Sequence, residues 1–214
     1  MGLTDLFTRY VFNGGSRRWL DAGTGQFVSE VGIADELAHL QAASNRTLEQ
    51  LTKQLYAGDI KLSDWQLAVA TELKDAHLAQ AAFARGGRPN MGPQQLGRVG
   101  GNLADEYRHL DKFAGGIADG SVSEAQALSR INQYGDATDQ AYQREWAIQR
   151  RRPEWEGLPT LNQVPRDGGT VCHGHCNCQL DEHEDGIHWV LYPGESCDDC
   201  QGLADHGPYQ PGNV

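Results

Sequence analysis

All five cysteines of the chain lie in one short C-terminal stretch, and this clustering constrains the fold more than any other feature. A C-H-G-H-C-N-C cluster occupies residues 172–178, and a C-D-D-C cluster occupies residues 197–200. Zinc prefers four tetrahedral ligands drawn from thiolate and imidazole, and two short clusters joined by a hairpin-length spacer can supply them. We therefore predict one structural zinc ion with four of the five cysteines as ligands. The candidate ligands are Cys172, Cys176, Cys178, Cys197 and Cys200.

The two clusters do not identify their ligands equally well. In C-x-x-C a tight turn points both sulfurs at one ion, so Cys197 and Cys200 are the clearer pair. The first cluster offers three thiols, of which Cys176 and Cys178 would lie on one face of an extended strand. Two of these three would complete the site. The histidines that remain alternatives to a thiol are His173 and His175.

Other uses of the cysteines fit the sequence less well. Their number is odd and the residues after Met1 do not resemble a signal peptide, which argues against disulfides. A redox C-x-x-C normally stands between a strand and a helix of a βαβ unit, a context that the sequence does not predict here. Zinc deaminases pair P-C-x-x-C with H-x-E, and the chain contains no H-x-E. A structural zinc ion is therefore favoured over disulfides, unligated thiols, and a catalytic or redox site.

Four amphipathic patterns precede the cysteines. In each, apolar residues recur every three or four positions, which lays a continuous stripe along one face of a helix. Short glycine-rich turns between such helices predict an antiparallel four-helix bundle or helical hairpins, with the stripes as core. Two S-x-x-Q/E patterns, at Ser63 and at Ser121, predict capping boxes at the starts of the second and fourth helices. The helices are expected over residues 29–56, 63–85, 93–118 and 121–152.

Two features inside the helical region bear on its packing and chemistry. Gly100 and Gly101 lower the helix propensity of the third segment, so we expect a kink or a close helix crossing there. His39, His77 and His109 fall on different helices without the Glu-x-x-His spacing of di-iron bundles, which argues against a metal inside the bundle.

The chain is thus predicted to be mainly α-helical, with a small zinc-stapled β-hairpin at its end. Alternating β-forming residues predict hairpin strands over 176–180 and 187–192, whose ends bring the two cysteine clusters together. A hairpin this short cannot bury enough surface alone, so zinc would supply the missing stability. The predicted domains are a flexible N-terminal arm (1–28), a helical bundle (29–152), a linker (153–167) and a zinc-ribbon-like module (168–214).

Charge and hydropathy exclude some functional classes. The formal net charge is −11, and the residues from Arg166 onward include nine Asp or Glu and a single Arg or Lys. Proteins that bind nucleic acid through phosphates carry clustered Lys and Arg, so this acidic module is expected to contact protein instead. No apolar run approaches the roughly 20 residues that a membrane-spanning helix needs.

Several segments resemble proteins of tailed bacteriophages and prophages that are described as structural or head-morphogenesis (minor head) proteins. They are T-V-C-H-G-H-C-N-C-Q-L (170–180), W-V-L-Y-P-G-E-S-C-D-D-C-Q-G-L-A-D-H-G-P-Y (189–209), G-D-I-K-L-S-D-W-Q (58–66) and R-W-L-D-A-G-T-G-Q-F-V-S (18–29). The similarity extends over most of the chain. The better-known head-morphogenesis domain has C-x-x-C first and H-P-x-C-x-C second, whereas this chain has the reverse order, which sets it apart from that exact family.

The resemblance implies a non-enzymatic virion protein of the phage head or portal vertex, made in the cytoplasm of the bacterial host. Its expected partners are the portal protein and the major capsid protein, and self-association into a homo-oligomer is a further expectation. The alternative is a phage-encoded metal-dependent enzyme, such as a nuclease or a deaminase-like toxin, which would need an open metal position and a positioned base. Its candidate residues are His173, His175, Asp181, His183 and His188.

Overall fold

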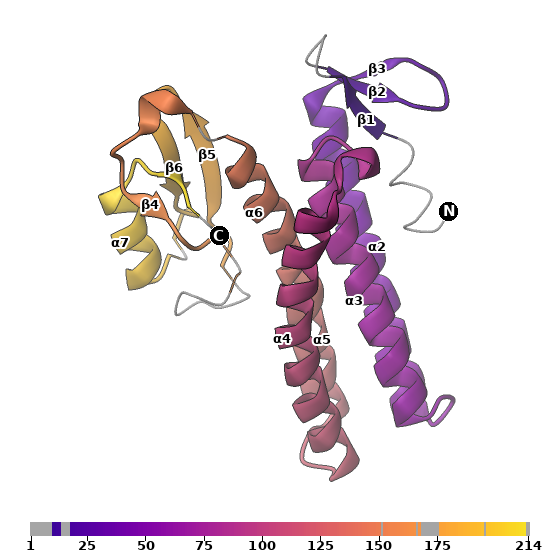
Figure 1. Cartoon of the computed structure of the whole chain (residues 1–214). Helices are drawn as coiled ribbons and strands as arrows, with labels where there is room; N and C mark the ends of the chain where they lie inside the picture. The colour runs from indigo at the N-terminus through magenta and orange to yellow at the C-terminus, as the bar shows by residue number, and fades with distance from the viewer. Residues whose placement is uncertain are drawn as a thin grey trace. The chain divides into compact units, whose positions relative to one another are not determined.

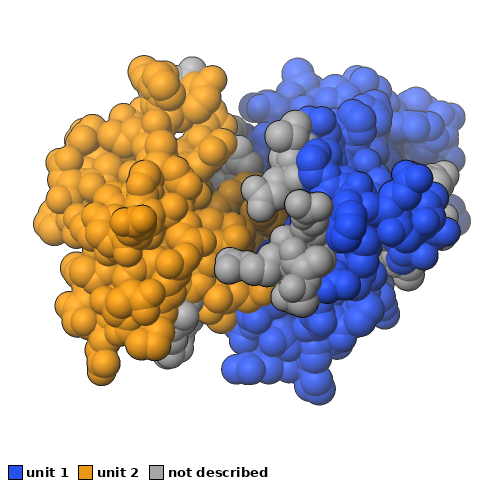
Figure 2. Space-filling view, turned by 90° about the horizontal axis from the view of Figure 1, so that it is seen from above, with its two compact units in different colours: residues 1–138 blue, residues 139–214 orange. Residues whose placement is uncertain are grey.

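The computed structural model describes residues 10–13, 18–150, 152–165, 167, 176–194 and 196–212 (Figure 1). The described chain is mainly helical, with small strand pairs, as the sequence predicts. It divides into two compact units, residues 1–138 and 139–214 (Figure 2). None of the described helices combines the length and the apolar character that crossing a bilayer requires.

The first unit opens with a small antiparallel sheet in the order β1-β2-β3, formed by Tyr10–Asn13, Arg18–Asp21 and Phe27–Val28. The turn that leads into β3 is closed by the Asp21 carboxylate, whose Oδ1 accepts hydrogen bonds from the backbone N–H of Gly23 and Thr24. The rings of Tyr10 and Trp19 lie 6.2 and 6.1 Å from the ring of Phe83. Residues 10–13 and 18–28, expected within a flexible arm, therefore include strands that pack on a helix.

Four long helices complete this unit: α2 (Glu30–Ala57), α3 (Leu62–Ala84), α4 (Pro93–Ala118) and α5 (Glu124–Ala137). A single 3-10 turn, η1 (Arg88–Asn90), lies between α3 and α4. Helix α2 lies against both α3 and α5, and α3 lies against α4. The apolar stripes form the core, in which the Trp65 and Phe113 rings meet edge to face at 5.6 Å.

Local sequence explains most of the helix ends. Ser29 caps α2 by accepting the N–H of Gly32 at 3.1 Å, and Gly58 ends the helix with the left-handed φ of 80° that glycine tolerates. The two predicted capping boxes were misplaced. Ser63 lies inside α3, which begins without a side-chain cap, and α5 is capped by Ser123 with Gln126. Ser123 has the extended backbone that an N-cap requires, whereas Ser121 lies in the preceding turn.

The close helix crossing lies at a different glycine from the pair we expected. A Cβ on Gly100 or Gly101 would meet nothing within 4 Å, so neither position is a tight contact. A Cβ on Gly135 in α5 would instead collide with the side chain of Asn45 and come within 3.3 Å of Leu48 Cδ1, both on α2. Gly135 is therefore the position at which α5 approaches α2 most closely among the helical glycines of this unit.

The predicted fourth helix is divided in two. Helix α5 ends at Ala137, and α6 covers Asp139–Gln149. Both the backbone N–H and the hydroxyl of Thr138 donate to the carbonyl of Gly135, at 3.2 and 2.8 Å. These bonds close a tight turn at Thr138, between the two helices. The two compact units divide after Thr138, whereas the sequence placed the end of the helical domain at Pro153.

The second unit surrounds its own apolar core. Strands β5 (Gln179–His183) and β6 (Gly186–Val190) form the predicted antiparallel hairpin, with Leu180 paired to Trp189. Helix α7 (Asp198–His206) follows, and β7 (Gln210–Pro211) pairs in parallel with β4 (Thr160–Leu161). The segment 153–167, expected as a linker, thus supplies a strand, the 3-10 turn η2 (Pro153–Trp155) and core side chains such as Trp155 and Val164.

Candidate metal centre

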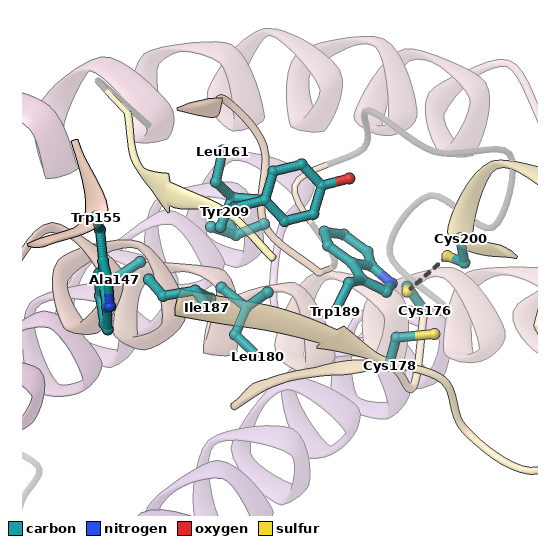
Figure 3. Close-up of a cluster of buried hydrophobic side chains, with 11 residues drawn as sticks. Ala147, Trp155, Leu161, Cys176, Cys178, Leu180, Ile187, Trp189, Cys200 and Tyr209 are labelled. Atoms are coloured by element: carbon teal, nitrogen blue, oxygen red, sulfur yellow. Dashed lines mark hydrogen bonds between the residues drawn. The ribbon is translucent and has the colours of Figure 1, made fainter. Parts of the chain in front are cut away.

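Three cysteine sulfurs converge in the core of the second unit (Figure 3). The Sγ atoms of Cys176, Cys178 and Cys200 all lie within 4.8 Å of one another, and those of Cys176 and Cys200 are 3.5 Å apart. A disulfide bond is about 2.0 Å long, so these sulfurs are separate thiols. Thiolates at about 2.3 Å from a tetrahedral zinc ion lie roughly 3.8 Å apart. The three sulfurs therefore have a spacing at which they could bind one metal ion.

Local structure explains how the first two cysteines face the core. Cys176 and Cys178 are 1% and 4% exposed, while Asn177 between them is exposed. This alternation continues into β5, where Leu180 is buried and Gln179 is exposed. An extended backbone places residues i and i+2 on one face, so both sulfurs point to the same side. The predicted strand start at Cys176 is wrong by three residues, since β5 begins at Gln179 and the cysteines precede it.

The third cysteine comes from a helix. Cys200 is fully buried in the first turn of α7, and Cys197 is the N-cap residue of the same helix. The C-x-x-C spacing therefore places the two residues at the N-cap and the third helical position, which lie next to each other on the first turn. Cys197 is half-buried and packs against the same core, although its sulfur does not belong to the group of three.

The surroundings of the sulfurs are apolar. Burial raises the pKa of the Cys176 thiol from 9.0 to about 11, because a thiolate there would lose its hydration. Without a cation this thiol stays protonated at neutral pH, and metal binding would have to release its proton. The buried residues of this core are Ala147, Trp155, Leu161, Val164, Cys176, Cys178, Leu180, Ile187, Trp189, Cys200 and Tyr209.

One buried polar atom next to the sulfurs has no partner among the described residues. The indole Nε1 of Trp189 makes no hydrogen bond to any described residue, although the side chain is only 3% exposed. Figure 3 shows the nitrogen edge of this indole turned toward the sulfur of Cys176. Leaving a buried N–H without an acceptor costs about 1–3 kcal/mol, and a metal-bound thiolate is an anionic acceptor. The residues present therefore fit an ion held by thiolates.

The remaining predicted ligands are placed as follows. Cys172, His173 and His175 lie outside the described residues. Of the five cysteines, the structure brings three together, places Cys197 at the edge of the same core, and leaves Cys172 undescribed. A fourth ligand would come from Cys197 or from the segment that contains Cys172.

Of the residues named for an enzymatic site, Asp181, His183 and His188 are described, and they lie on the outward face of the hairpin. His183 Nε2 is 3.3 Å from an oxygen of Asp181, and His188 Nε2 is 2.9 Å from an oxygen of Asp185. The two imidazole rings lie 4.5 Å apart, centroid to centroid. Across the described ranges, no group of three His, Cys, Asp or Glu other than the cysteines brings its ligand atoms within 4.8 Å of one another.

Sequence reasoning missed Trp189 as part of the site. A tryptophan in an alternating strand is usually core, and nothing in the linear pattern indicates where its N–H points.

Comparison of the chain with protein-family models, curated proteins and solved structures yields no match.

Proposed function

We propose that the chain is a non-enzymatic assembly protein whose C-terminal unit is held together by one structural zinc ion. The observation that carries the zinc proposal is the meeting of Cys176, Cys178 and Cys200 inside an apolar core. The helices of the first unit would act as an antiparallel bundle, and the ion would staple the hairpin of the second. The assembly role rests on the resemblance of the cysteine motifs and their flanking segments to phage head-morphogenesis proteins.

Burial supports a structural ion over a catalytic one. Structural zinc sites are closed by four protein ligands, whereas catalytic sites keep one position open for water or substrate. The three cysteines are at most 4% exposed, and they belong to a core cluster whose other described members are aliphatic or aromatic. A fourth thiolate would close the coordination sphere. The His183 and His188 pair, which could serve as bases, lies on the exposed face of the hairpin.

The ion would hold together short elements of the second unit that are not stable by themselves. The strands of the hairpin have five residues each and α7 has nine, too few to form stable structure on their own. An ion shared by Cys176, Cys178 and Cys200 would join the segment before β5 to the first turn of α7. Because the ligands come together only when the unit folds, the free energy of metal binding would contribute directly to its folding.

The charge of this unit supports a protein partner. Residues 139–214 contain thirteen Asp or Glu against five Arg and no Lys, and only one of these Arg follows residue 165, which disfavours contact of the cysteine-containing segment with DNA phosphates. Val190 and Tyr192 are 43% and 48% exposed, so apolar area is available beside the acidic groups. A portal or major capsid protein of the phage head is the partner that the resemblance indicates, with the virion as the site of action.

The metal content of the purified full-length protein tests the zinc proposal. We expect one zinc ion per chain by elemental mass spectrometry, and loss of that ion in Cys200→Ser. His188→Ala is the matched control, because it removes a ligand-type side chain from the same hairpin without touching the sulfurs, and it should retain the ion. A wild-type protein without metal, or full retention by Cys200→Ser, would overturn the proposal. Loss of metal in His188→Ala would favour the enzymatic alternative.

The assembly role needs its own measurement. Quantitative mass spectrometry of density-purified particles and proheads would compare this protein with the portal and major capsid subunits. A fixed low ratio, comparable to the portal, is expected for a minor head component. Absence from both proheads and mature particles would remove the virion role, whatever the metal content of the protein.

A further inference from the structure

The inference concerns the side chain of Trp189 and rests on the proposed zinc site. We propose that the indole N–H of Trp189 is the hydrogen-bond donor to the metal-bound sulfurs of Cys176 and Cys200, and that it sets how tightly the ion is held. Trp189 would act as a positioning residue, since it touches the ligands and not the ion.

The strand register aims this side chain at the sulfurs. Trp189 pairs with Leu180 across the hairpin, and both side chains face the core. Cys178 and Cys176 continue the inward-facing positions that Leu180 begins. The Trp189 indole therefore lies on the same face of the hairpin as the two thiols. In Figure 3 the nitrogen edge of the indole is turned toward Cys176. The Sγ of Cys176 is in hydrogen-bond contact with the Sγ of Cys200 at 3.5 Å.

A second tryptophan in the same core shows how a buried indole N–H is ordinarily satisfied. Trp155 is 1% exposed, and its Nε1 donates to the backbone carbonyl of Glu184 at 3.0 Å. Trp189 is equally buried and has no such acceptor among the described residues. Phenylalanine would fill much of the same apolar space without an orphaned donor. The N–H of Trp189 therefore calls for an acceptor at the sulfur cluster.

The strength of that acceptor depends on the charge of the sulfur. A neutral thiol accepts hydrogen bonds weakly, whereas a thiolate bound to a cation retains much of its negative charge. In an apolar core, a donor aimed at that charge is worth more than in water. Partners of this kind, which contact the ligands of an ion, commonly change metal affinity about 10–100-fold when they are removed. Trp189 would therefore favour the metal-loaded form over the metal-free thiols.

The test compares Trp189→Phe with Trp155→Phe in the full-length protein, with cobalt(II) and zinc as probes. Both variants lose one indole N–H from the same core. We expect Trp189→Phe to bind one ion with about 10–100-fold lower affinity, faster release to a chelator, and a shifted sulfur-to-cobalt charge-transfer band. Trp155→Phe should lower stability while its band and affinity stay at the wild-type values. Equal affinity and an unshifted band in Trp189→Phe would overturn the inference.

A measurement on the wild-type protein keeps the inference testable if Trp189→Phe does not fold. The indole proton of Trp189 should shift downfield when cadmium-113 is bound, and it should show scalar coupling to the metal through the N–H···S contact. The absence of both effects in a cadmium-loaded protein would refute the hydrogen bond. If the wild-type chain binds no metal, the zinc proposal itself fails. If it binds metal and Trp189 has no effect, only the present inference fails.

Discussion

Replacing Gly135 with alanine tests the helix packing of the first unit. Alanine normally stabilises a helix interior by about 1 kcal/mol relative to glycine. Here the new methyl group would collide with the side chain of Asn45, whose Cγ would be 2.9 Å away, and would crowd Leu48 Cδ1 at 3.3 Å. Asn45 is held in place because its Nδ2 donates to Asp136 Oδ1 at 3.0 Å.

The expected magnitude follows from these opposing effects. Overpacking a tight contact costs about 1–3 kcal/mol, and turning Asn45 away gives up a hydrogen bond worth about 1 kcal/mol. Set against the propensity gain of about 1 kcal/mol, Gly135→Ala should lower the free energy of unfolding by about 1–3 kcal/mol. Gly101→Ala is the matched control, since its Cβ meets nothing within 4 Å on an exposed helix face. That substitution should stabilise the protein by up to about 1 kcal/mol.

Urea unfolding followed by far-UV circular dichroism measures both variants, because the long helices of the first unit dominate the signal. The double variant Asn45→Ala/Gly135→Ala removes the colliding side chain. Its loss in the free energy of unfolding should therefore be smaller than the sum of the losses in the two single variants. A Gly135→Ala protein as stable as Gly101→Ala would refute the close approach of α5 to α2. The metal content of all these variants should equal that of the wild type.

Three further predictions concern a thiol, a buried hydroxyl and an ion pair. Because burial raises the pKa of Cys176 from 9.0 to about 11, the metal-free native protein binds more protons than the unfolded chain between these values. The contribution of this thiol to the free energy of unfolding should therefore be complete below pH 9.0 and should be lost as the pH rises through about 11. In chelator-treated protein, Cys176→Ser should lack this dependence on pH. Thr52→Val removes the hydroxyl that accepts the Trp65 indole N–H at 3.2 Å, and should lower stability in urea by about 1–3 kcal/mol without changing metal content. Glu182→Gln weakens the pair with Arg150 Nε, 2.9 Å away and partly exposed, so the loss in thermal stability should stay below about 1 kcal/mol.

The local sequence was sufficient wherever structure depends on neighbours along the chain. The apolar stripes predicted four helical regions, and Ser29, Gly58 and Pro93 lie at the helix ends where capping chemistry places them. The hairpin was predicted as well, because the alternation of β-forming residues is a local feature. The capping boxes at Ser63 and Ser121 were misplaced, since the same short pattern also fits serines inside a helix or in a preceding turn.

The candidate site could be predicted in part. The chemistry of thiols and their spacing pointed to all five cysteines as candidate ligands, and the structure brings the sulfurs of three of them, Cys176, Cys178 and Cys200, within 4.8 Å of one another. The spacing favoured Cys197 and Cys200 as the clearer pair and left open which two of Cys172, Cys176 and Cys178 would join them, whereas the sulfur of Cys197 is not in the group of three. Ligand choice depends on where the two clusters meet in three dimensions, and a sequence pattern records only their separation along the chain.

The sequence by itself thus determined the helices, the hairpin and the class of ligand that the C-terminal unit can offer. The tertiary structure alone decided which segments pair over long separations, such as the parallel pairing of Thr160 with Gln210. It also decided that the chain tightens at Thr138, that α5 meets α2 at Gly135, and that the Trp189 indole is turned toward sulfur. The physical reason is that periodicity and capping act between residues a few positions apart. Close packing and the direction of a buried donor are instead set by partners distant in the sequence.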